Sequence, residues 1–239
     1  MINRAEIKYE ARGILRTARV NPYIVTLLMA AVGFVLERAA DLAQGGSLFY
    51  SYDLMGRYYT ALDAVLESGN PAALDQLVAS IPESTGTGFF FSIMIALVTL
   101  VLNGGFTLYC MGVRRGEEMP YSTLADGLGS AGRLIWCGVL MSVKIFLWSL
   151  LFGIPGIIAM YRYQFAPYNV LTDGSISAGE AIRRSCRQTS GMKWDLFVLD
   201  LSFLGWMILA NLTFGLLNIW LTPYMAMCRL AYYERAQGR

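Results

Sequence analysis

The stretch FFFSIMIALVTLVLNGGFTLYCM, residues 89–111, decides the fold class because its 23 residues include no charged side chain. A transmembrane α-helix needs about 20 consecutive, mostly apolar residues to cross the ~30 Å hydrocarbon core of a bilayer. Surface helices of soluble proteins instead carry charged residues along one face. This stretch therefore predicts a helix that crosses a membrane.

The composition of the whole chain favours the same fold class. Of its 239 residues, 56% are hydrophobic and only 15% are charged, whereas an average soluble domain carries about 25% charged residues. The apolar residues gather in long runs between short charged stretches. We predict a single all-α membrane domain, a polytopic helical bundle. Its six predicted spans cover residues 22–36, 89–111, 134–151, 157–171, 194–212 and 214–230.

Several classes of function are disfavoured by what the sequence lacks. The net charge of +2 is too small to indicate a nucleic-acid partner, and there is no histidine to serve as general base or metal ligand. No phosphate-binding loop, GxSxG motif or cluster of metal ligands is present. The four cysteines have no CxxC spacing, so we expect reduced thiols. We predict no catalytic residue, no cofactor and no metal.

The distribution of basic residues predicts the orientation of the spans. Cytoplasmic connections of membrane proteins are enriched in Lys and Arg. With the N-terminus inside, 15 of the 19 basic residues fall on the cytoplasmic side, and only Arg38 and Arg57 fall outside. Both termini are then cytoplasmic. The cytoplasmic segments are residues 1–21, 112–133, 172–193 and 229–239.

The long external segment, residues 40–88, is acidic. It contains six Asp and Glu residues and a single basic residue. Apolar side chains recur at helical spacing between Met55 and Leu66 and again between Leu74 and Ile81, with Pro71 as a first helical residue and residues 82–88 as a linker into the next span. We predict an extracellular helical insertion, a hairpin that offers a surface to a partner membrane protein or extracellular protein.

Two cytoplasmic segments have a strongly basic face. Residues 2–19 form an amphipathic helix in which basic residues recur every four positions, and residues 175–191 form a second basic helix that opens with the capping box Ser177–Glu180. Such faces bind membranes that carry anionic lipids, and solvated helices are the alternative. The candidate contacts to inner-leaflet lipids are Arg4, Lys8, Arg12, Arg16, Arg183, Arg184 and Arg187.

A short motif recurs near the inner ends of three predicted spans, as FTLY at 106–109, FAPY at 165–168 and LTPY at 221–224. A helical segment also precedes each outward span. Recurrence at a similar spacing indicates three pseudo-repeated helical hairpins, with coincidence as the alternative. A proline inside a span frees a backbone carbonyl, which kinks the helix or must be satisfied by a neighbouring helix. The residues of the motif are Tyr109, Pro167, Tyr168, Pro223 and Tyr224.

Ionisable side chains inside a membrane are candidates for function. Lys144 and Arg162 lie near the middle of two predicted spans, and Asp200 lies within a third. Asp200 is the natural partner of either base. One acid against two bases leaves a positive charge in surplus. The three residues therefore form a structural ion pair, a site for a lipid or another anion, or a transport pathway.

The C-terminal part of the chain resembles a known family. The resemblance rests on APYNVL at 166–171, SAGEAIRRS at 177–185, KWDLFVLDLSFLGW at 193–206 and LTPY at 221–224, together with RAEIK at 4–8 and YSTLAD at 121–126. These segments resemble a bacterial membrane family catalogued as domain of unknown function nine-seven-five. The resemblance implies a polytopic helical protein of a bacterial plasma membrane and no known activity. The chain is also distantly similar to the membrane domains of glycerophosphodiester phosphodiesterases, which implies a role linked to lipids.

These observations predict a non-enzymatic integral membrane protein that binds lipid or a partner protein. A small transporter or channel subunit is the alternative if Lys144, Arg162 and Asp200 share a hydrated cavity. An intramembrane enzyme is a third alternative, without a nucleophile and base that the sequence identifies.

Overall fold

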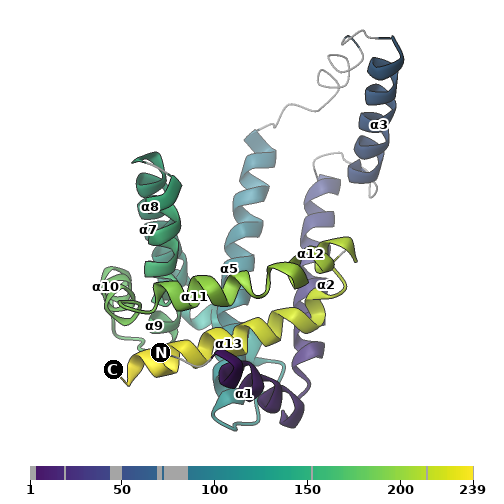
Figure 1. Cartoon of the computed structure of the whole chain (residues 1–239). Coiled ribbons are helices and arrows are strands. Elements are labelled where there is room, and N and C mark those ends of the chain that lie inside the picture. Colours follow the sequence, from purple (N-terminus) through teal and green to yellow (C-terminus); the bar gives the residue numbers. More distant parts are fainter. Residues whose placement is uncertain are drawn as a thin grey trace. The chain divides into compact units, whose positions relative to one another are not determined.

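The computed structural model describes residues 4–18, 20–43, 50–68, 72, 86–151, 153–213 and 215–238. These residues form helices, turns and short connections, with no strand among them (Figure 1). The prediction of an all-α fold is confirmed. The helices are α1 (Arg4–Thr17), α2 (Pro22–Ala43), α3 (Tyr50–Ser68), α5 (Gly86–Arg114), α6 (Thr123–Asp126), η1 (Gly127–Ser130), α7 (Ala131–Leu151), α8 (Gly153–Tyr163), α9 (Ala166–Thr172), α10 (Ala178–Gln188), α11 (Lys193–Leu201), α12 (Leu204–Leu212) and α13 (Asn218–Gln237).

The chain divides into two compact units, residues Ala31–Leu97 and the remainder. The smaller unit contains α3, which matches the first helix of the predicted external hairpin and exposes Tyr58 and Tyr59. The second predicted helix falls mainly on residues 73–85, outside the described residues. Helix α5 begins at Gly86, so the last three residues of the predicted linker are helical instead. The long apolar helix therefore begins about one turn before the predicted span 89–111.

Four helical segments are long and apolar enough to cross a membrane: Pro22–Ala40, Phe90–Arg114, Thr123–Leu150 and Lys193–Leu212. At most 22% of the residues in their most apolar windows are buried within the protein. A soluble protein rarely leaves so much contiguous apolar surface in contact with water. Lipid is the medium in which these exposed side chains are stable, as the sequence predicted for a membrane protein.

The other two predicted spans have a different form. Residues 157–171 are divided between α8 and α9 at Gln164–Phe165, and α13 continues to Gln237 with charged residues in its last turns. Neither is among the candidate spans found in the described part of the chain. The number of crossings therefore stays a prediction.

The main core of the larger unit buries the apolar face of α1. Ile7 and Ala11 are fully buried, in one cluster with Met227 and Ala231 of α13. The apolar side of this amphipathic helix is thus occupied by protein. Only its basic side is free to meet lipid head groups.

The helix order agrees with the predicted repeat, since a short helix precedes each of three long apolar segments. These short helices are α1, α6 with η1, and α10, which precede α2, α7 and α11. The three motif tyrosines all pack on the main core, Tyr109 fully buried and Tyr168 and Tyr224 partly buried. The Tyr109 hydroxyl donates to the Val20 carbonyl, 2.9 Å away. The repeat as such stays a prediction.

The break between α8 and α9 lies just before Pro167, as predicted for a proline inside a helix. Ser185 of α10 satisfies the backbone groups at this break. Its Oγ donates to the Arg162 carbonyl at 2.7 Å and accepts from the Phe165 N–H at 3.1 Å. A fully buried serine thus replaces the hydrogen bonds that the helix has lost.

We expect Ser185→Ala to lower the free energy of unfolding by about 1–3 kcal/mol, because the buried Phe165 N–H loses its acceptor and the Arg162 carbonyl keeps only the longer bond from Thr189 Oγ1. Thermal unfolding of the detergent-solubilised protein measures this loss. Ser190→Ala, at an exposed position that follows the same helix, is the control and should leave the melting temperature unchanged. Equal melting temperatures for wild type and Ser185→Ala would contradict the assigned role.

Candidate functional site

The three intramembrane charges named from the sequence do not come together. Asp200 forms an ion pair with Arg229 at 3.0 Å and accepts a hydrogen bond from the Tyr161 hydroxyl at 3.2 Å. Lys144 is exposed on α7 and Arg162 is half-buried on α8. Among the described residues, neither base contacts Asp200. The predicted pairing of Asp200 with Lys144 or Arg162 is wrong.

The Asp200–Arg229 ion pair was not predicted from the sequence, for a physical reason. Arg229 lies at the inner end of the predicted sixth span, residues 214–230, and was counted with the cytoplasmic segment 229–239. In the structure α13 continues through this position as a helix, which brings Arg229 beside Asp200 of α11. Arg229 therefore neutralises Asp200, and the argument for one site formed by Lys144, Arg162 and Asp200 no longer holds.

Helix α1 carries opposite charges on its two flanks. Glu6 and Glu10 lie on one flank, while Lys8, Arg12 and Arg16 lie on the other, because residues four apart share a helix face. The buried apolar face lies between the two flanks. Each flank therefore meets a different part of the larger unit.

The acidic flank meets Arg114, at the C-terminal end of α5. The Arg114 side chain is only 5% exposed and bonds to Glu10 at 2.7 Å and to Glu234 of α13 at 2.6 Å. It also donates to the Met227 carbonyl at 3.3 Å. This ion network joins three helices that are far apart in the chain. The sequence analysis did not predict this network. The available signal was the position of Glu6 and Glu10 on one flank of the otherwise basic helix α1.

The basic flank meets aromatic residues. The Lys8 Nζ donates to Ser202 Oγ at 2.8 Å and lies 4.7 Å above the centre of the Phe203 ring. The Arg12 guanidinium lies 5.5 Å from the centre of the Tyr224 ring. Both geometries are those of cation–π contacts, which are attractive because the ring face is electron-rich.

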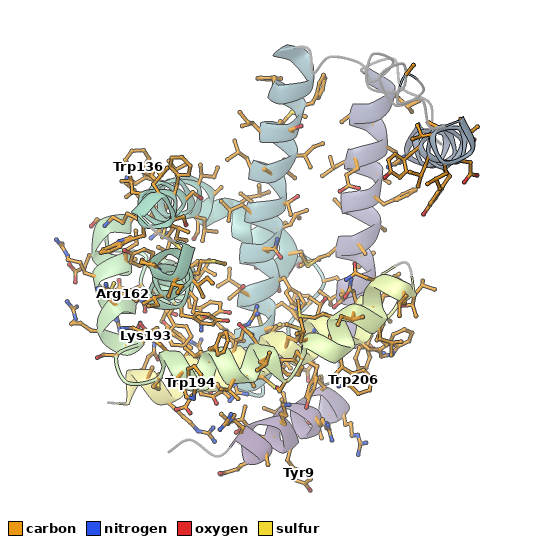
Figure 2. The ribbon with its side chains drawn as sticks, turned by 45° about the horizontal axis from the view of Figure 1, so that its top comes forward. Tyr9, Trp136, Arg162, Lys193, Trp194 and Trp206 are labelled. Carbon is orange, nitrogen blue, oxygen red and sulfur yellow. The ribbon has the colours of Figure 1, made fainter. Side chains whose placement is uncertain are left out.

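A pocket of about 300 Å³ opens beside this flank, which we name the α1 pocket. Its walls combine two arginines, four aromatic rings and three leucines from α1, α2, α12, α13 and the turn before α13. Trp206 of α12 is one of these aromatic residues (Figure 2). The lining residues are Arg12, Leu15, Arg16, Tyr23, Trp206, Leu217, Trp220, Leu221 and Tyr224.

The polar groups of the α1 pocket are the guanidinium groups of Arg12 and Arg16 and the hydroxyl groups of its tyrosines. No carboxylate lines the pocket, and no acid in the described ranges forms an ion pair with Arg12 or Arg16. The hydroxyl oxygen of Tyr224 is buried, and no group that the structure describes meets hydrogen-bond geometry with it. Buried hydroxyl groups are normally hydrogen-bonded, so these three side chains form a site to which a ligand oxygen is suited.

The second basic helix, α10, is different. Its N-cap is Ser177, which accepts from the Glu180 N–H, and the predicted capping box is confirmed on this side. Arg183 and Arg187 both bond to Glu180, at 2.7 and 3.1 Å, and these hydrogen bonds lower the pKa of the Glu180 carboxyl. The basic residues of α10 are thus partly neutralised within their own helix, unlike Arg12 and Arg16.

Comparison with known proteins covers the C-terminal part of the chain. Residues 151–239 match the family described as "Protein of unknown function (DUF975)", which confirms the resemblance found in the sequence. The match is narrower than that resemblance, which also included residues 4–8 and 121–126. No curated protein and no solved structure matches the chain. The likeness to glycerophosphodiester phosphodiesterases stays a prediction. Helices α8 to α13, which carry Trp206, Trp220 and Tyr224 of the α1 pocket, are therefore similar to this family of unknown function.

Proposed function

We propose that this protein is a non-enzymatic membrane protein that binds the phosphate head group of an anionic lipid in the α1 pocket. The observation that carries the proposal is the pair Arg12 and Arg16. These two bases have no acid partner among the described residues, and they line one pocket with the buried hydroxyl of Tyr224.

A phosphate group suits this arrangement chemically. Guanidinium groups form paired, charge-assisted hydrogen bonds to phosphate oxygens, and these are stronger than bonds between neutral groups. The Tyr224 hydroxyl can donate to a further phosphate oxygen. A volume of about 300 Å³ lies at the low end for ligand pockets. It accommodates a head group, while the acyl chains stay in the surrounding bilayer.

The aromatic wall supports a position of the pocket at the level of lipid head groups. Tryptophan and tyrosine concentrate at membrane–water interfaces, where one edge of the ring is apolar and the other is wet. Trp206 and Trp220 are each more than half exposed and line the pocket beside Leu217. A lipid bound there keeps its head group near the arginines and its chains beside these rings.

The double variant Arg12→Gln, Arg16→Gln tests this proposal. We expect at least a tenfold loss of affinity for vesicles that contain an anionic phospholipid, because each lost charge-assisted bond is worth about 1.5–3 kcal/mol. The matched control is Arg183→Gln, Arg187→Gln, which removes the same charge from arginines already bonded to Glu180. Binding is measured on the detergent-purified full chain with fluorescent vesicles of anionic or neutral phospholipid.

The outcomes separate specific from non-specific binding. Equal losses in the two double variants would show that only net charge matters and would contradict a site at the α1 pocket. Competition by millimolar inorganic phosphate would identify the ligand as free phosphate instead of lipid. We expect weak competition, since the lipid also contacts the apolar wall.

Transport through the membrane receives no support as an alternative. It required Lys144, Arg162 and Asp200 around one hydrated cavity, and the described residues do not place them in one. A partner protein at residues 40–88 stays a prediction, since much of that segment lies outside the described residues.

A further inference from the structure

The candidate span Lys193–Leu212 consists of two short helices and not one continuous helix. Helices α11 and α12 are nine residues each and are separated by Ser202 and Phe203. At about 1.5 Å per residue, Ser202 lies roughly 14 Å along the segment from Lys193. If the segment crossed a ~30 Å hydrocarbon core, Ser202 and Phe203 would lie near the middle of the bilayer.

The contacts of this break are incompatible with such a depth. Lys8 of α1 donates to Ser202 Oγ and lies over the Phe203 ring. The same flank of α1 also carries Arg12 and Arg16, which are exposed. Placing Ser202 at mid-bilayer would take this charged helix into hydrocarbon with it, and charged side chains at that depth are strongly unfavourable.

Helix α13 also contacts the charged helix α1, which limits its depth in the membrane in the same way. It packs along α1, with Met227 and Ala231 in the core that buries the apolar face of α1. Its Tyr224 contacts Arg12 and its Arg235 bonds to Glu10, both residues of α1. Contacts to a charged surface helix thus occur along α13 instead of only at one end, as they would for a crossing helix.

The directions of the helices agree with these contacts. In Figure 1, α11, α12 and α13 run crosswise to α7 and α8, and Figure 2 shows the same relation from a second viewpoint. Helix α7 is a candidate crossing helix, and α8 packs beside it. Helices at a steep angle to a crossing helix lie close to the membrane plane.

We infer that α11, α12 and α13 lie in the membrane plane, in the head-group and upper acyl-chain region on the side of α1, and do not cross the bilayer. The buried face of α11 and α12, which includes Leu199 and Phe203, packs on the protein core. The opposite face meets acyl chains. Its exposed apolar residues include Trp194, Leu201, Leu204, Trp206, Ile208 and Leu212. This inference does not depend on lipid binding in the α1 pocket.

The turn between α12 and α13 distinguishes an in-plane segment from a crossing one. If α11 and α12 lie in the plane, Asn218 is on the same side of the membrane as Tyr9; if they cross, it is on the opposite side. Ile154, at the turn between α7 and α8, serves as the matched far-side position. All three side chains are exposed.

Single-cysteine labelling tests this placement. Asn218→Cys, Tyr9→Cys and Ile154→Cys are made in a full chain with Cys186→Ser, since the other three native cysteines are buried. An impermeant maleimide is added to sealed membrane vesicles before or after permeabilisation. We expect Asn218→Cys to label from the same side as Tyr9→Cys, about tenfold faster than from the other side. Labelling of Asn218→Cys with the sidedness of Ile154→Cys would overturn the inference.

Depth measurements with a tryptophan probe give a second, independent readout. In a variant that keeps only Trp206, lipids brominated near the head group should quench its fluorescence several-fold more than lipids brominated near the chain ends. A chain with Val143→Trp as its single tryptophan is the deep control, since Val143 is exposed halfway along α7. A Trp206 signal with the quenching pattern of this control would also overturn the inference.

Discussion

Gly105→Val is expected to prevent stable folding of the larger unit, because there is no space for a side chain at this position. A Cβ on Gly105 would lie 2.7 Å from the carbonyl carbon of Leu124 and closer still to its oxygen. Both are backbone atoms, which cannot rotate away as a flexible side chain can. Gly127 approaches α5 in the same manner, since a Cβ there would lie 2.5 Å from the Val101 carbonyl oxygen.

Small residues allow close packing of this kind in membrane proteins, where van der Waals contact between helices contributes strongly to association. Overpacking by one methyl group costs about 1–3 kcal/mol, and a larger group costs more. Gly105→Ala should therefore lower the melting temperature in detergent, and Gly105→Val should yield aggregated protein in size-exclusion chromatography. Gly132→Ala is the matched control, because no atom lies within 4 Å of that Cβ position. A Gly105→Val protein as stable as wild type would show that α5 and α6 are not in this contact.

Arg114→Met is expected to lower the free energy of unfolding by about 1–3 kcal/mol, since bonds to charged groups are worth that much. The variant keeps most of the side-chain volume, removes the base that the described residues place beside Glu234, and leaves Glu10 with Arg235 at 3.4 Å. Arg114→Lys should recover part of the loss, because it restores the charge without the forked geometry of the guanidinium. Chemical or thermal unfolding of the purified protein measures both changes.

An exposed ion pair provides the comparison for this variant. Arg183 bonds to Glu180 one helical turn away, and its side chain is mostly exposed. Exposed pairs of this type contribute about 0–1 kcal/mol, so Arg183→Met should have little effect. If the two substitutions had equal effects, the burial of Arg114 would not be important for stability, and the ion network would not hold α1 in place.

The elements that follow from local pattern were predictable from the sequence. Residues 89–111 form most of α5 because an uninterrupted apolar run needs no distant partner to be helical in lipid. The break before Pro167 and the capping box at Ser177 also follow from residues near in the chain. No proline marks the break at Ser202 and Phe203, so the segment 194–212 was expected to be one continuous span.

The elements that depend on tertiary packing were not predictable. Asp200 finds Arg229 only because α11 and α13 lie side by side, and Arg114 finds Glu10 only because α1 returns to the end of α5. The sequence identified the basic face of α1, including Arg12 and Arg16, but contact of this face with lipid stays a prediction. The aromatic side chains of the α1 pocket come from several helices, and the sequence analysis assigned the tryptophans among them to the ends of spans.

The walls of the α1 pocket come from opposite ends of the polypeptide. Trp206, Trp220 and Tyr224 belong to the family segment 151–239, whereas Arg12 and Arg16 precede it by most of the chain's length. The segment that matches the family thus supplies most of the aromatic wall, and the leading helix supplies both positive charges. Substitutions on the basic flank of that one helix change the charge of the pocket without altering its aromatic wall.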